Sequence, residues 1–435
     1  MNLTQLKTIF SANGCQKIYV KVLSPNDNSK NQIYFSGSFD ILNILPITEI
    51  TNEAAGDWNK ERFKAKINFS WIGDDRNLYI APKSQLILYP KYPEVRFSGF
   101  LIGCKNAPSE LMTQRTAKRL LFFSVSDKGE VLGYVAAPDS EIARELDNLA
   151  VFEIYGVFKV IELPIAQNNR QKLISELLRI NQLGWIKSKR LDRLGNILPC
   201  DAPNCGGYTL EAELGITPNG YSEPDFLGWE IKQFGVTNFA KINSKIITLM
   251  TPEPTHGFYK TEGAEAFIRK YGYPDVSGKP DRMNFGGIHK SGALHPKTNL
   301  TLELIGFDNE SGKIRNTDGR IALLDQNQNE TASWSFSSML LHWNRKHDKA
   351  CYVPSLYQPD DGRNYKYGNN VILGTGTDFQ LFLKEMASGH IYYDPGIKLE
   401  NMSTKPAIKK RSQFRIKSEN LANLYKVNEI VDLTA

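Results

Sequence analysis

The spacing of apolar residues changes near residue 165, and this change limits how the chain can fold. Before it, short runs rich in β-branched and aromatic residues are separated by turn residues, which is typical of strands. Beyond it, strand-length apolar runs alternate with segments of helical spacing, which is typical of mixed α/β structure. At 435 residues the chain also exceeds what one hydrophobic core usually organises. We therefore expect at least two domains.

The first domain is expected over residues 1–165, as an α+β barrel. Its predicted strands are 17–23, 63–71, 85–89, 94–103, 119–125 and 131–136, with further strand character over 151–164. Its predicted helices are 107–114 and 140–148.

A polar, helix-compatible stretch follows, and the boundary is expected between Pro164 and Gln171. We predict a linker and connecting helix over 166–185 and a mixed α/β domain over 186–435. The predicted helices of this domain are 208–214, 262–273, 335–346 and 379–387, and the predicted strands are 226–234, 245–251, 300–307 and 350–357.

Composition excludes several classes of protein. With 41% hydrophobic and 23% charged residues, long disorder and coiled coils are excluded. No apolar run approaches the roughly 18 residues of a membrane span, and the start lacks the order of a signal peptide. We therefore expect a cytoplasmic protein without a membrane partner. The five cysteines are odd in number and scattered, so a disulfide framework is not expected.

The net charge of +6 arises mostly beyond residue 165. Between Lys405 and Lys417 there are six cations and no acid. Such a cluster favours a phosphate-rich partner, and the alternative is a solvated basic surface.

The residues with the clearest chemistry lie between Pro224 and Gln233. On a strand, Glu230 and Lys232 share one face, whereas Trp229 and Ile231 point into apolar packing. Asp225 enters from the preceding turn. Two carboxylates can hold Mg²⁺, and an ammonium can orient or deprotonate water, as metal-assisted phosphodiester hydrolysis requires.

Glu230-Ile231-Lys232 is the only acid–x–lysine triplet in the chain, and it lies in an apolar run where unpaired charges are costly. The alternative is a partly buried pair that its neighbours neutralise. Glu211, on the preceding helix, either adds a carboxylate or is solvated. Solvation is the preferred interpretation for Glu213.

Residues 206–235, GGYTLEAELGITPNGYSEPDFLGWEIKQFG, resemble the catalytic core of the MvaI/BcnI family of type II restriction endonucleases, members of the PD-(D/E)xK superfamily. Asp225, Glu230 and Lys232 match the catalytic triad of that family. Residues 69–104 are similar to the amino-terminal effector domain of EcoRII-like enzymes, a DNA-binding pseudobarrel similar to plant B3 domains. Together the two resemblances cover nearly the whole chain.

The resemblance implies a type II, IIE-like restriction endonuclease in a prokaryotic cytoplasm. It implies a B3-like pseudobarrel followed by a mixed α/β PD-(D/E)xK nuclease domain, which works as a monomer with Mg²⁺ and without a nucleotide cofactor. Asp225 and Glu230 would hold the metal. The nuclease would cleave double-stranded DNA at CCWGG, where W is A or T, and the first domain would bind a second copy of the site as effector.

Candidate DNA-reading residues lie in both halves. In the first, Arg96 is expected to contact a guanine edge. Its weaker companions, which could equally be ordinary barrel surface, are Trp71, Arg76, Lys91, Glu94 and Lys105. In the second, Arg411 and Arg415 are expected to contact bases and Lys409 and Lys410 phosphate, with His390 and Asp394 in the same region.

Two possible zinc sites are disfavoured. His342 and His347 have no clustered third ligand, so DNA contact or structural hydrogen bonding is preferred, and we include His347 among the DNA-binding candidates. Cys200 and Cys205 lack a second cysteine pair.

Two alternative functions remain open: a nicking endonuclease of DNA repair, and a non-catalytic B3-like DNA-binding regulator with a decayed nuclease domain.

Overall fold

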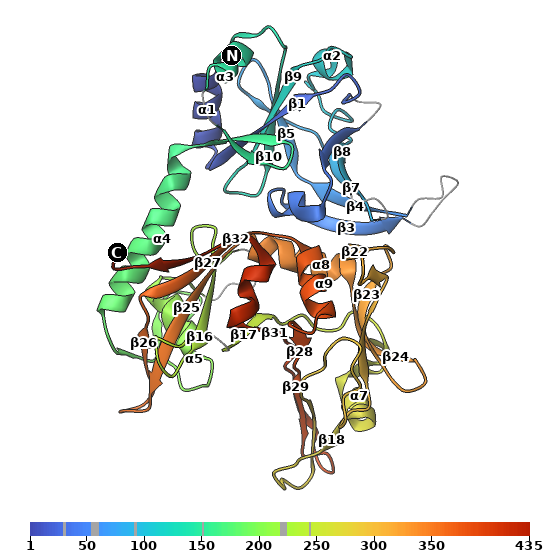
Figure 1. The fold of residues 1–435 in the computed structure, drawn as a ribbon, viewed down its shortest axis with the longest axis vertical. Helices are drawn as coiled ribbons and strands as arrows, with labels where there is room; N and C mark the ends of the chain where they lie inside the picture. Colours follow the sequence, from blue (N-terminus) through green and yellow to red (C-terminus); the bar gives the residue numbers. More distant parts are fainter. Residues whose placement is uncertain (29–31, 54–60, 91–93, 150–151, 218–223, 243–244) are drawn as a thin grey trace. The chain divides into compact units, whose positions relative to one another are not determined.

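The structure is a computed structural model that describes all residues except 29–31, 54–60, 91–93, 150–151, 218–223 and 243–244 (Figure 1). The residues group into two compact units, Met1–Leu173 and Ile174–Ala435. The long helix α4 (Pro164–Gln182) begins in the first unit and ends in the second. Among the described helices, none is both long enough and apolar enough to cross a membrane.

The first unit contains two sheets. The larger has the strand order β11-β12-β1-β9-β10-β5-β6, in which only the β10–β5 pair is parallel, and the other is antiparallel with the order β2-β8-β7-β4-β3. The strands are β1 (Lys17–Leu23), β2 (Ile33–Ser36), β3 (Ile47–Glu53), β4 (Arg62–Ile67), β5 (Phe69–Ile72), β6 (Leu78–Ile80), β7 (Gln85–Tyr89), β8 (Glu94–Ser98), β9 (Arg119–Val125), β10 (Val131–Ala136), β11 (Glu153–Tyr155) and β12 (Phe158–Glu162). The helices are α1 (Leu3–Ala12), α2 (Ser109–Thr113), α3 (Glu141–Asp147) and the 3-10 helix η1 (Phe39–Asn43).

Aromatic side chains join the two sheets. Phe35 of β2 stacks on Phe123 of β9 at a centroid distance of 5.3 Å, and Phe97 of β8 packs on Phe69 of β5 at 5.0 Å. Buried aromatic rings supply large apolar areas, so these contacts form the core of the unit.

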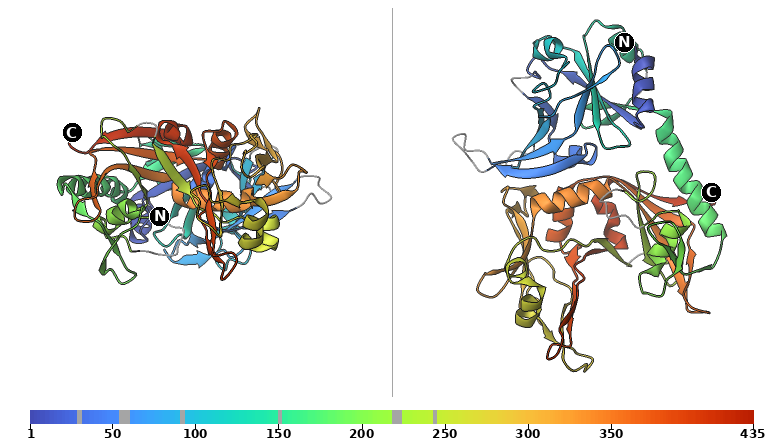
Figure 2. Two further views of the ribbon diagram at one scale, coloured as in Figure 1. Left: turned by 90° about the horizontal axis from the view of Figure 1, so that it is seen from below. Right: turned by 180° about the vertical axis from the view of Figure 1, so that it is seen from behind.

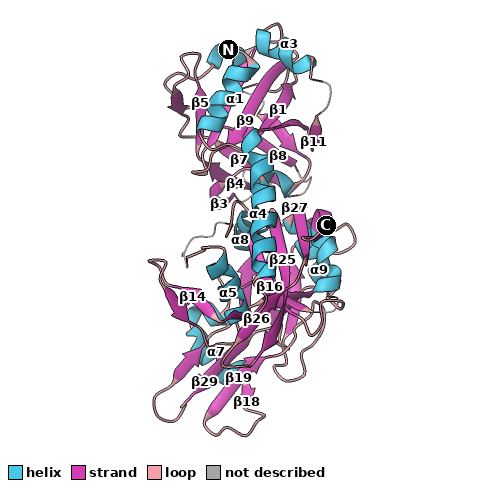
Figure 3. Cartoon of the chain, turned by 90° about the vertical axis from the view of Figure 1, so that its left-hand side faces the viewer, coloured by secondary structure: helices cyan, strands magenta, loops and turns pink. Residues whose placement is uncertain are grey.

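Helices α1 and α3 cover the larger sheet (Figure 3). Phe10 of α1 and Ile142 of α3 are fully buried with strand residues in one cluster. Sequence analysis missed α1, although Asn2 and Gln5 form a capping box at its start.

The second unit is a mixed α/β structure around a sheet with the order β13-β26-β25-β27-β32, in which β16 also pairs with β25. The strands of this sheet are β13 (Ile186–Lys187), β16 (Glu230–Gly235), β25 (Lys349–Gln358), β26 (Asn364–Tyr367), β27 (Asn370–Thr377) and β32 (Tyr425–Asp432). The β16–β25 pair is parallel and the other pairs are antiparallel.

Smaller sheets surround the central one. Strands β18, β19, β29 and β30 form an arm that extends away from the central sheet (Figure 2). The remaining strands are β14 (Lys189–Leu191), β15 (Ile197–Pro199), β17 (Ile246–Met250), β18 (Tyr273–Pro274), β19 (Arg282–Gly286), β20 (Thr301–Ile305), β21 (Phe307–Asp308), β22 (Lys313–Ile314), β23 (Arg320–Leu324), β24 (Glu330–Ser335), β28 (Tyr392–Tyr393), β29 (Gly396–Glu400), β30 (Ala407–Lys409) and β31 (Phe414–Lys417).

Helices α8 and α9 pack side by side in the second unit (Figure 1). Trp343 of α8 contacts Phe382 of α9 at a centroid distance of 4.8 Å, and Trp343 is fully buried. This packing fixes the position of the last turns of α8, which contribute residues to the candidate active site. The helices of the unit are α5 (Cys205–Glu213), α6 (Phe258–Thr261), α7 (Gly263–Tyr271), α8 (Phe336–His347), α9 (Phe379–Ala387) and the 3-10 helix η2 (Ser418–Leu424).

Several predicted elements are confirmed with the expected bounds, namely β1, β7, β9, β10 and α9. The single strand predicted over 63–71 is wrong. It divides at Asn68, so that β4 and β5 lie in different sheets. The strand predicted over 94–103 ends at Ser98, because Gly99 has a φ of 76° and begins a turn.

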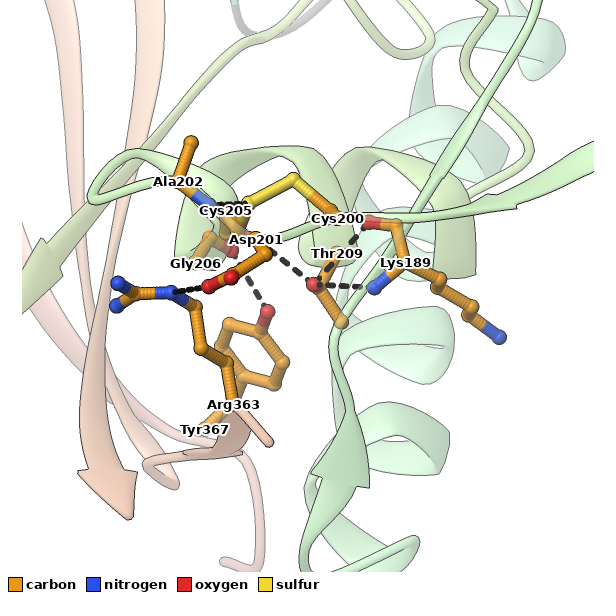
Figure 4. The surroundings of a disulfide bond; sticks show 9 residues. All are labelled: Lys189, Cys200, Asp201, Ala202, Cys205, Gly206, Thr209, Arg363 and Tyr367. Carbon is orange, nitrogen blue, oxygen red and sulfur yellow. Dashed lines mark hydrogen bonds and ion pairs between the residues drawn. A yellow bond between two sulfur atoms is a disulfide. The ribbon is translucent and has the colours of Figure 1, made fainter. Parts of the chain in front are cut away.

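One disulfide joins Cys200, which follows β15, to Cys205, the first residue of α5 (Figure 4). The expectation that no cysteines pair is therefore wrong for these two. Cys200 and Cys205 are five positions apart, on either side of the turn into α5, and their Cα atoms are 5.9 Å apart, which a disulfide can span. The wide spacing of the other cysteines does not bear on this pair. The bond anchors the start of α5, and Thr209 of α5 also binds the backbone of Lys189 in β14.

Replacing both Cys200 and Cys205 with Ser is expected to lower the free energy of unfolding of the second unit by about 2 kcal/mol, because the bond restricts the unfolded chain. Urea denaturation without reductant measures this. Dithiothreitol should weaken the wild type equally and leave the double variant unchanged. Cys104→Ser, at a free cysteine, should keep the response to dithiothreitol. Equal stability of oxidised and reduced wild type would contradict the expectation.

Candidate active site

A tight turn precedes β16. The backbone N–H of Phe226 donates to the carbonyl of Trp229 at 3.0 Å, and the N–H of Trp229 donates to the carbonyl of Phe226 at 2.8 Å. The central residues Leu227 and Gly228 have φ values of 50° and 82°, as a two-residue type I′ turn requires. The turn reverses the chain and carries Asp225 back alongside β16.

Asp225 is fixed at the start of β16 by a backbone contact. Its Oδ2 accepts a hydrogen bond from the N–H of Ile231 at 3.0 Å. Burial, followed by the nearby Glu230 carboxylate, raises the pKa of Asp225 to about 6. Two carboxylates this close together are well suited to share a cation.

Glu230 and Lys232 point to the same side of β16, as the strand period predicts. Lys232 Nζ donates to Glu230 Oε1 at 2.6 Å, and Glu230 is only 1% exposed. The second carboxylate oxygen, Glu230 Oε2, is buried and has no hydrogen-bond partner among the described residues. A buried carboxylate oxygen without a partner is costly unless a ligand satisfies it.

Helix α8 contributes two further groups to this site. Lys346 Nζ lies 3.9 Å from Glu230 Oε1. His342, one turn earlier, has a lowered pKa, first because it is buried and then because Lys346 and Lys232 are cationic neighbours. Lys346 is not among the site residues predicted from the sequence, because its only signal is its helical spacing from His342, which many solvated helix faces share.

Helix α5 packs against β16 and contributes Glu211 (Figure 3). Burial, followed by the Asp225 carboxylate, raises the pKa of Glu211 to about 7. Of the two interpretations left open for Glu211, this favours an added carboxylate over solvation. Glu213 is not solvated as expected. It is 10% exposed and pairs with Lys189 at 2.5 Å and Arg179 at 3.6 Å.

The residues present fit a divalent cation. Mg²⁺ takes hard oxygen ligands, often one or two carboxylates completed by substrate phosphates and water. Asp225 and Glu230 supply two carboxylates, and Glu230 Oε2 has an unsatisfied lone pair. Across the described residues, no group of three or more His, Cys, Asp or Glu side chains could hold a metal by itself.

His347 is a core residue. It is fully buried, its Nε2 bonds the carbonyl of Leu249 at 3.2 Å, and its ring stacks on Trp343 at 4.1 Å. The sequence left two interpretations of His347 open, DNA contact and structural hydrogen bonding, and the structure supports structural hydrogen bonding. We correct its place among the DNA-binding candidates, because no part of the side chain reaches the surface.

The other DNA-binding candidates of the second unit are accessible to different degrees. Arg415 on β31 pairs with Asp394 at 2.5 Å, and both side chains are about one fifth exposed, at 24% and 20%. Lys409 pairs with Glu400 at 2.9 Å and is 70% exposed. His390 bonds Glu385 at 2.8 Å, whereas Lys410 and Arg411 are exposed. The structure thus brings Arg415 and Asp394 together.

In the first unit, Arg96 is 40% exposed, pairs with Glu94 on the same strand and lies over the ring of Tyr89. Arg76, in the turn between β5 and β6, and Lys105 are exposed. Lys91 lies outside the described residues. Trp71 is fully buried, and its Nε1 donates to the carbonyl of Phe100 at 2.6 Å. We therefore correct the expectation that Trp71 contacts DNA.

Asp225, Glu230 and Lys232 supply two carboxylates and an ammonium, a combination typical of metal-dependent nucleases. Residues 174–425 match the model of the MvaI/BcnI restriction endonuclease family. The chain belongs to the MvaI/BcnI restriction endonuclease family, whose members are restriction endonucleases that act on DNA.

Solved structures similar to parts of the chain include restriction endonuclease MvaI in complex with its cognate DNA substrate, with 20% identity and a TM-score of 0.45 over 60% of this chain and 97% of that chain. MvaI in the absence of DNA gives 18% identity and a TM-score of 0.33 over the same shares. The B3 domain of UbaLAI restriction endonuclease with cognate DNA gives 16% identity and a TM-score of 0.23, over 36% of this chain and 96% of that chain. The comparison with curated proteins found no match.

Glu211→Gln is expected to raise the melting temperature of the metal-free protein at pH 8 and to leave it nearly unchanged at pH 5. The fold raises the pKa of Glu211, so between about pH 4.5 and 7 the folded state binds a proton that the unfolded chain has lost. Stability is therefore lost as pH rises through this window, and Gln removes that loss. Roughly 1–2 kcal/mol, or about 2–8 °C, should be recovered.

Calorimetry in EDTA at both pH values measures this effect. Glu213→Gln is the matched control on the same helix. Because Glu213 is ion-paired, its loss should lower the melting temperature at pH 8. A Glu211→Gln variant that melts below the wild type at pH 8 would show that the Glu211 carboxylate is stabilising instead.

Proposed function

We propose that the second unit hydrolyses phosphodiester bonds of double-stranded DNA with Mg²⁺, using Asp225, Glu230 and Lys232. The observation that carries this proposal is the convergence of these side chains at the start of β16, where Glu230 Oε2 is buried and has no partner in the part of the chain that the structure describes. Membership of a restriction endonuclease family supports the substrate class.

Asp225 and Glu230 would hold the cation, and the backbone bond from Ile231 keeps the Asp225 carboxylate in place. When bound, the metal supplies Lewis-acid stabilisation of the phosphate and a lower pKa for its water. Lys232 orients the attacking water and compensates charge at the phosphate, since its side chain is 21% exposed and its ammonium lies beside Glu230. The products would be a 5′-phosphate and a 3′-hydroxyl.

The proposed target is CCWGG, read by the carboxy-terminal part of the second unit. Arg415 and Asp394 are adjacent, so one cation and one acid can address the guanine and cytosine edges of neighbouring base pairs. Arg411 would contact a base, Lys409 and Lys410 phosphate, and His390 either. With one set of Asp225, Glu230 and Lys232 per chain, a monomer would cut the two strands in separate steps.

For the first unit we propose the role of a B3-like effector domain that binds a second copy of the site. Its two sheets joined by an aromatic core are compatible with a pseudobarrel, and residues 69–104 resemble the effector domain of EcoRII-like enzymes. Arg96 is the proposed base contact, with Arg76, Glu94, Lys91 and Lys105 as companions. Arg96 is accessible, and its guanidinium is oriented by Glu94.

Asp225→Asn and Lys232→Ala are each expected to slow Mg²⁺-dependent cleavage of a CCWGG plasmid by roughly 100-fold or more, because each removes transition-state stabilisation. Binding of the same site with Ca²⁺ in place of Mg²⁺ should change little. Lys187→Ala, at an exposed lysine paired with Asp361, is the control and should cut normally. Normal cleavage by either site variant would refute the catalytic assignment.

A short duplex that carries CCWGG is expected to accelerate cleavage of a one-site plasmid in trans, since it would occupy the first unit. Arg96→Ala should remove this stimulation and keep basal cleavage, whereas Lys128→Ala, at an exposed lysine of the same unit, should keep both. Initial rates over a range of duplex concentrations measure the effect. A one-site plasmid cut at full rate without the duplex would exclude effector control.

A further inference from the structure

The last turn of α8 places a second ammonium beside the catalytic carboxylates. Lys346 Nζ is 3.9 Å from Glu230 Oε1, the same oxygen that accepts a hydrogen bond from Lys232 Nζ at 2.6 Å. Lysines from two different elements, strand β16 and helix α8, therefore face one carboxylate oxygen. Only Lys232 has a role in the chemistry proposed above.

The contact between Lys346 and Glu230 is longer than a hydrogen bond, which spans about 2.7–3.2 Å for N–H···O. Within the described part of the chain, no hydrogen-bond acceptor and no other carboxylate pairs with this ammonium. Its side chain is 25% exposed, so the group is largely withdrawn from bulk water. An ammonium has three donors, and those of Lys346 remain available to an anion that enters the site.

The charges of the site also favour an anionic ligand. Glu211, Asp225 and Glu230 provide three carboxylates, against two ammonium groups from Lys232 and Lys346. With all five ionised and one divalent cation bound, the site carries one net positive charge. A phosphodiester carries one negative charge. Without Lys346 the metal-loaded site would already be neutral and would attract the phosphate less.

We propose that Lys346 is a catalytic residue that binds a non-bridging oxygen of the scissile phosphate. This inference rests on the proposed nuclease function of the second unit. The water oxygen bonds to phosphorus and loses a proton to solvent, the P–O3′ bond breaks, and the leaving 3′-oxygen takes a proton from solvent, while Lys346 transfers no proton. Lys232 acts on the water, and Lys346 holds the phosphate and offsets the charge that builds on its oxygens.

The fixed position of α8 supports this division of roles. Trp343 and His347, on either side of Lys346 in the chain, are fully buried, and Trp343 Nε1 donates to Thr377 Oγ1 at 3.1 Å. The backbone at Lys346 is therefore rigid, and only the side chain needs to move to reach a phosphate. Such preorganisation is what a group that stabilises a transition state requires.

Lys346→Gln tests the inference in the full chain. Single-turnover cleavage at saturating DNA should slow by roughly 10- to 100-fold, the value of a hydrogen bond to a charged group. With Ca²⁺ in place of Mg²⁺, the plot of log affinity against log salt should become shallower by about 0.9, because one phosphate contact is lost. Lys346→Arg keeps the charge and should restore the salt slope.

Lys189→Gln is the matched control. Like that of Lys346, the side chain of Lys189 is 25% exposed, and it pairs with Glu213 of α5. Glu213 is two positions after Glu211, so it lies on the opposite side of the helix from the proposed chemistry. Lys189→Gln should leave the salt slope and the cleavage rate at wild-type values. Calorimetry of each variant separates loss of folding from loss of the contact.

A duplex with a neutral methylphosphonate at the scissile position provides a test that needs no cleavage. It should bind the wild type several-fold more weakly than the unmodified duplex, and this penalty should shrink in Lys346→Gln. A wild-type salt slope together with an undiminished methylphosphonate penalty in Lys346→Gln would overturn the inference. Slower cleavage by Lys346→Gln, with the salt slope and the methylphosphonate penalty of the wild type, would also overturn the inference. It would mean that Lys346 acts through Glu230 alone and does not contact the phosphate.

These readouts separate the inference from the proposal on which it rests. If the wild type does not cut DNA with Mg²⁺, the proposed function fails, and the binding measurements still decide whether Lys346 contacts phosphate. If Lys346→Gln does not fold, the salt slopes of Lys346→Met and Lys346→Arg are compared. Equal slopes for these two would overturn the assignment.

Discussion

The second unit depends on a buried carboxylate with one oxygen bonded and the other unpaired by any described residue. Glu230 lies almost entirely out of water, and Lys232 satisfies only Oε1. A buried acid in this condition costs stability that the rest of the sheet must supply. The arrangement is explained if the free oxygen serves a cation, because the cost is then removed when the ligand binds.

The ionisable groups around Glu230 are concentrated in a small volume. The type I′ turn brings Asp225 to the strand, α5 adds Glu211, and α8 adds Lys346 and His342. Burial raises the pKa values of Asp225 and Glu211 first, and the repulsion from neighbouring carboxylates raises them further. A divalent cation would relieve this repulsion, so metal binding and deprotonation of both acids should be coupled.

Sequence patterns predicted the centre of the site better than its edges. Strand periodicity placed Glu230 and Lys232 on one face, because this relation is local. The strand predicted over 226–234 is wrong at its start, since residues 226–229 form the turn that carries Asp225 and β16 begins at Glu230. Lys346 comes from a helix more than 100 positions away, and its approach to Glu230 depends on the pairing of β16 with β25, which no local pattern encodes. The burial of Trp71 and His347 could not be predicted from local patterns either, because aromatic and histidine side chains are common both in cores and at nucleic-acid surfaces.

The parallel pairing of β16 with β25 aligns Glu230 with Ala350 and Lys232 with Tyr352. Side chains alternate along a strand, so sliding β16 by one position would send both charged groups into the apolar layer and Ile231 into the open. Insertions and deletions before Asp225 in the sequence are therefore tolerable only if they leave that alignment intact. This six-residue ladder therefore has a single offset that keeps Glu230 and Lys232 on the side of Asp225.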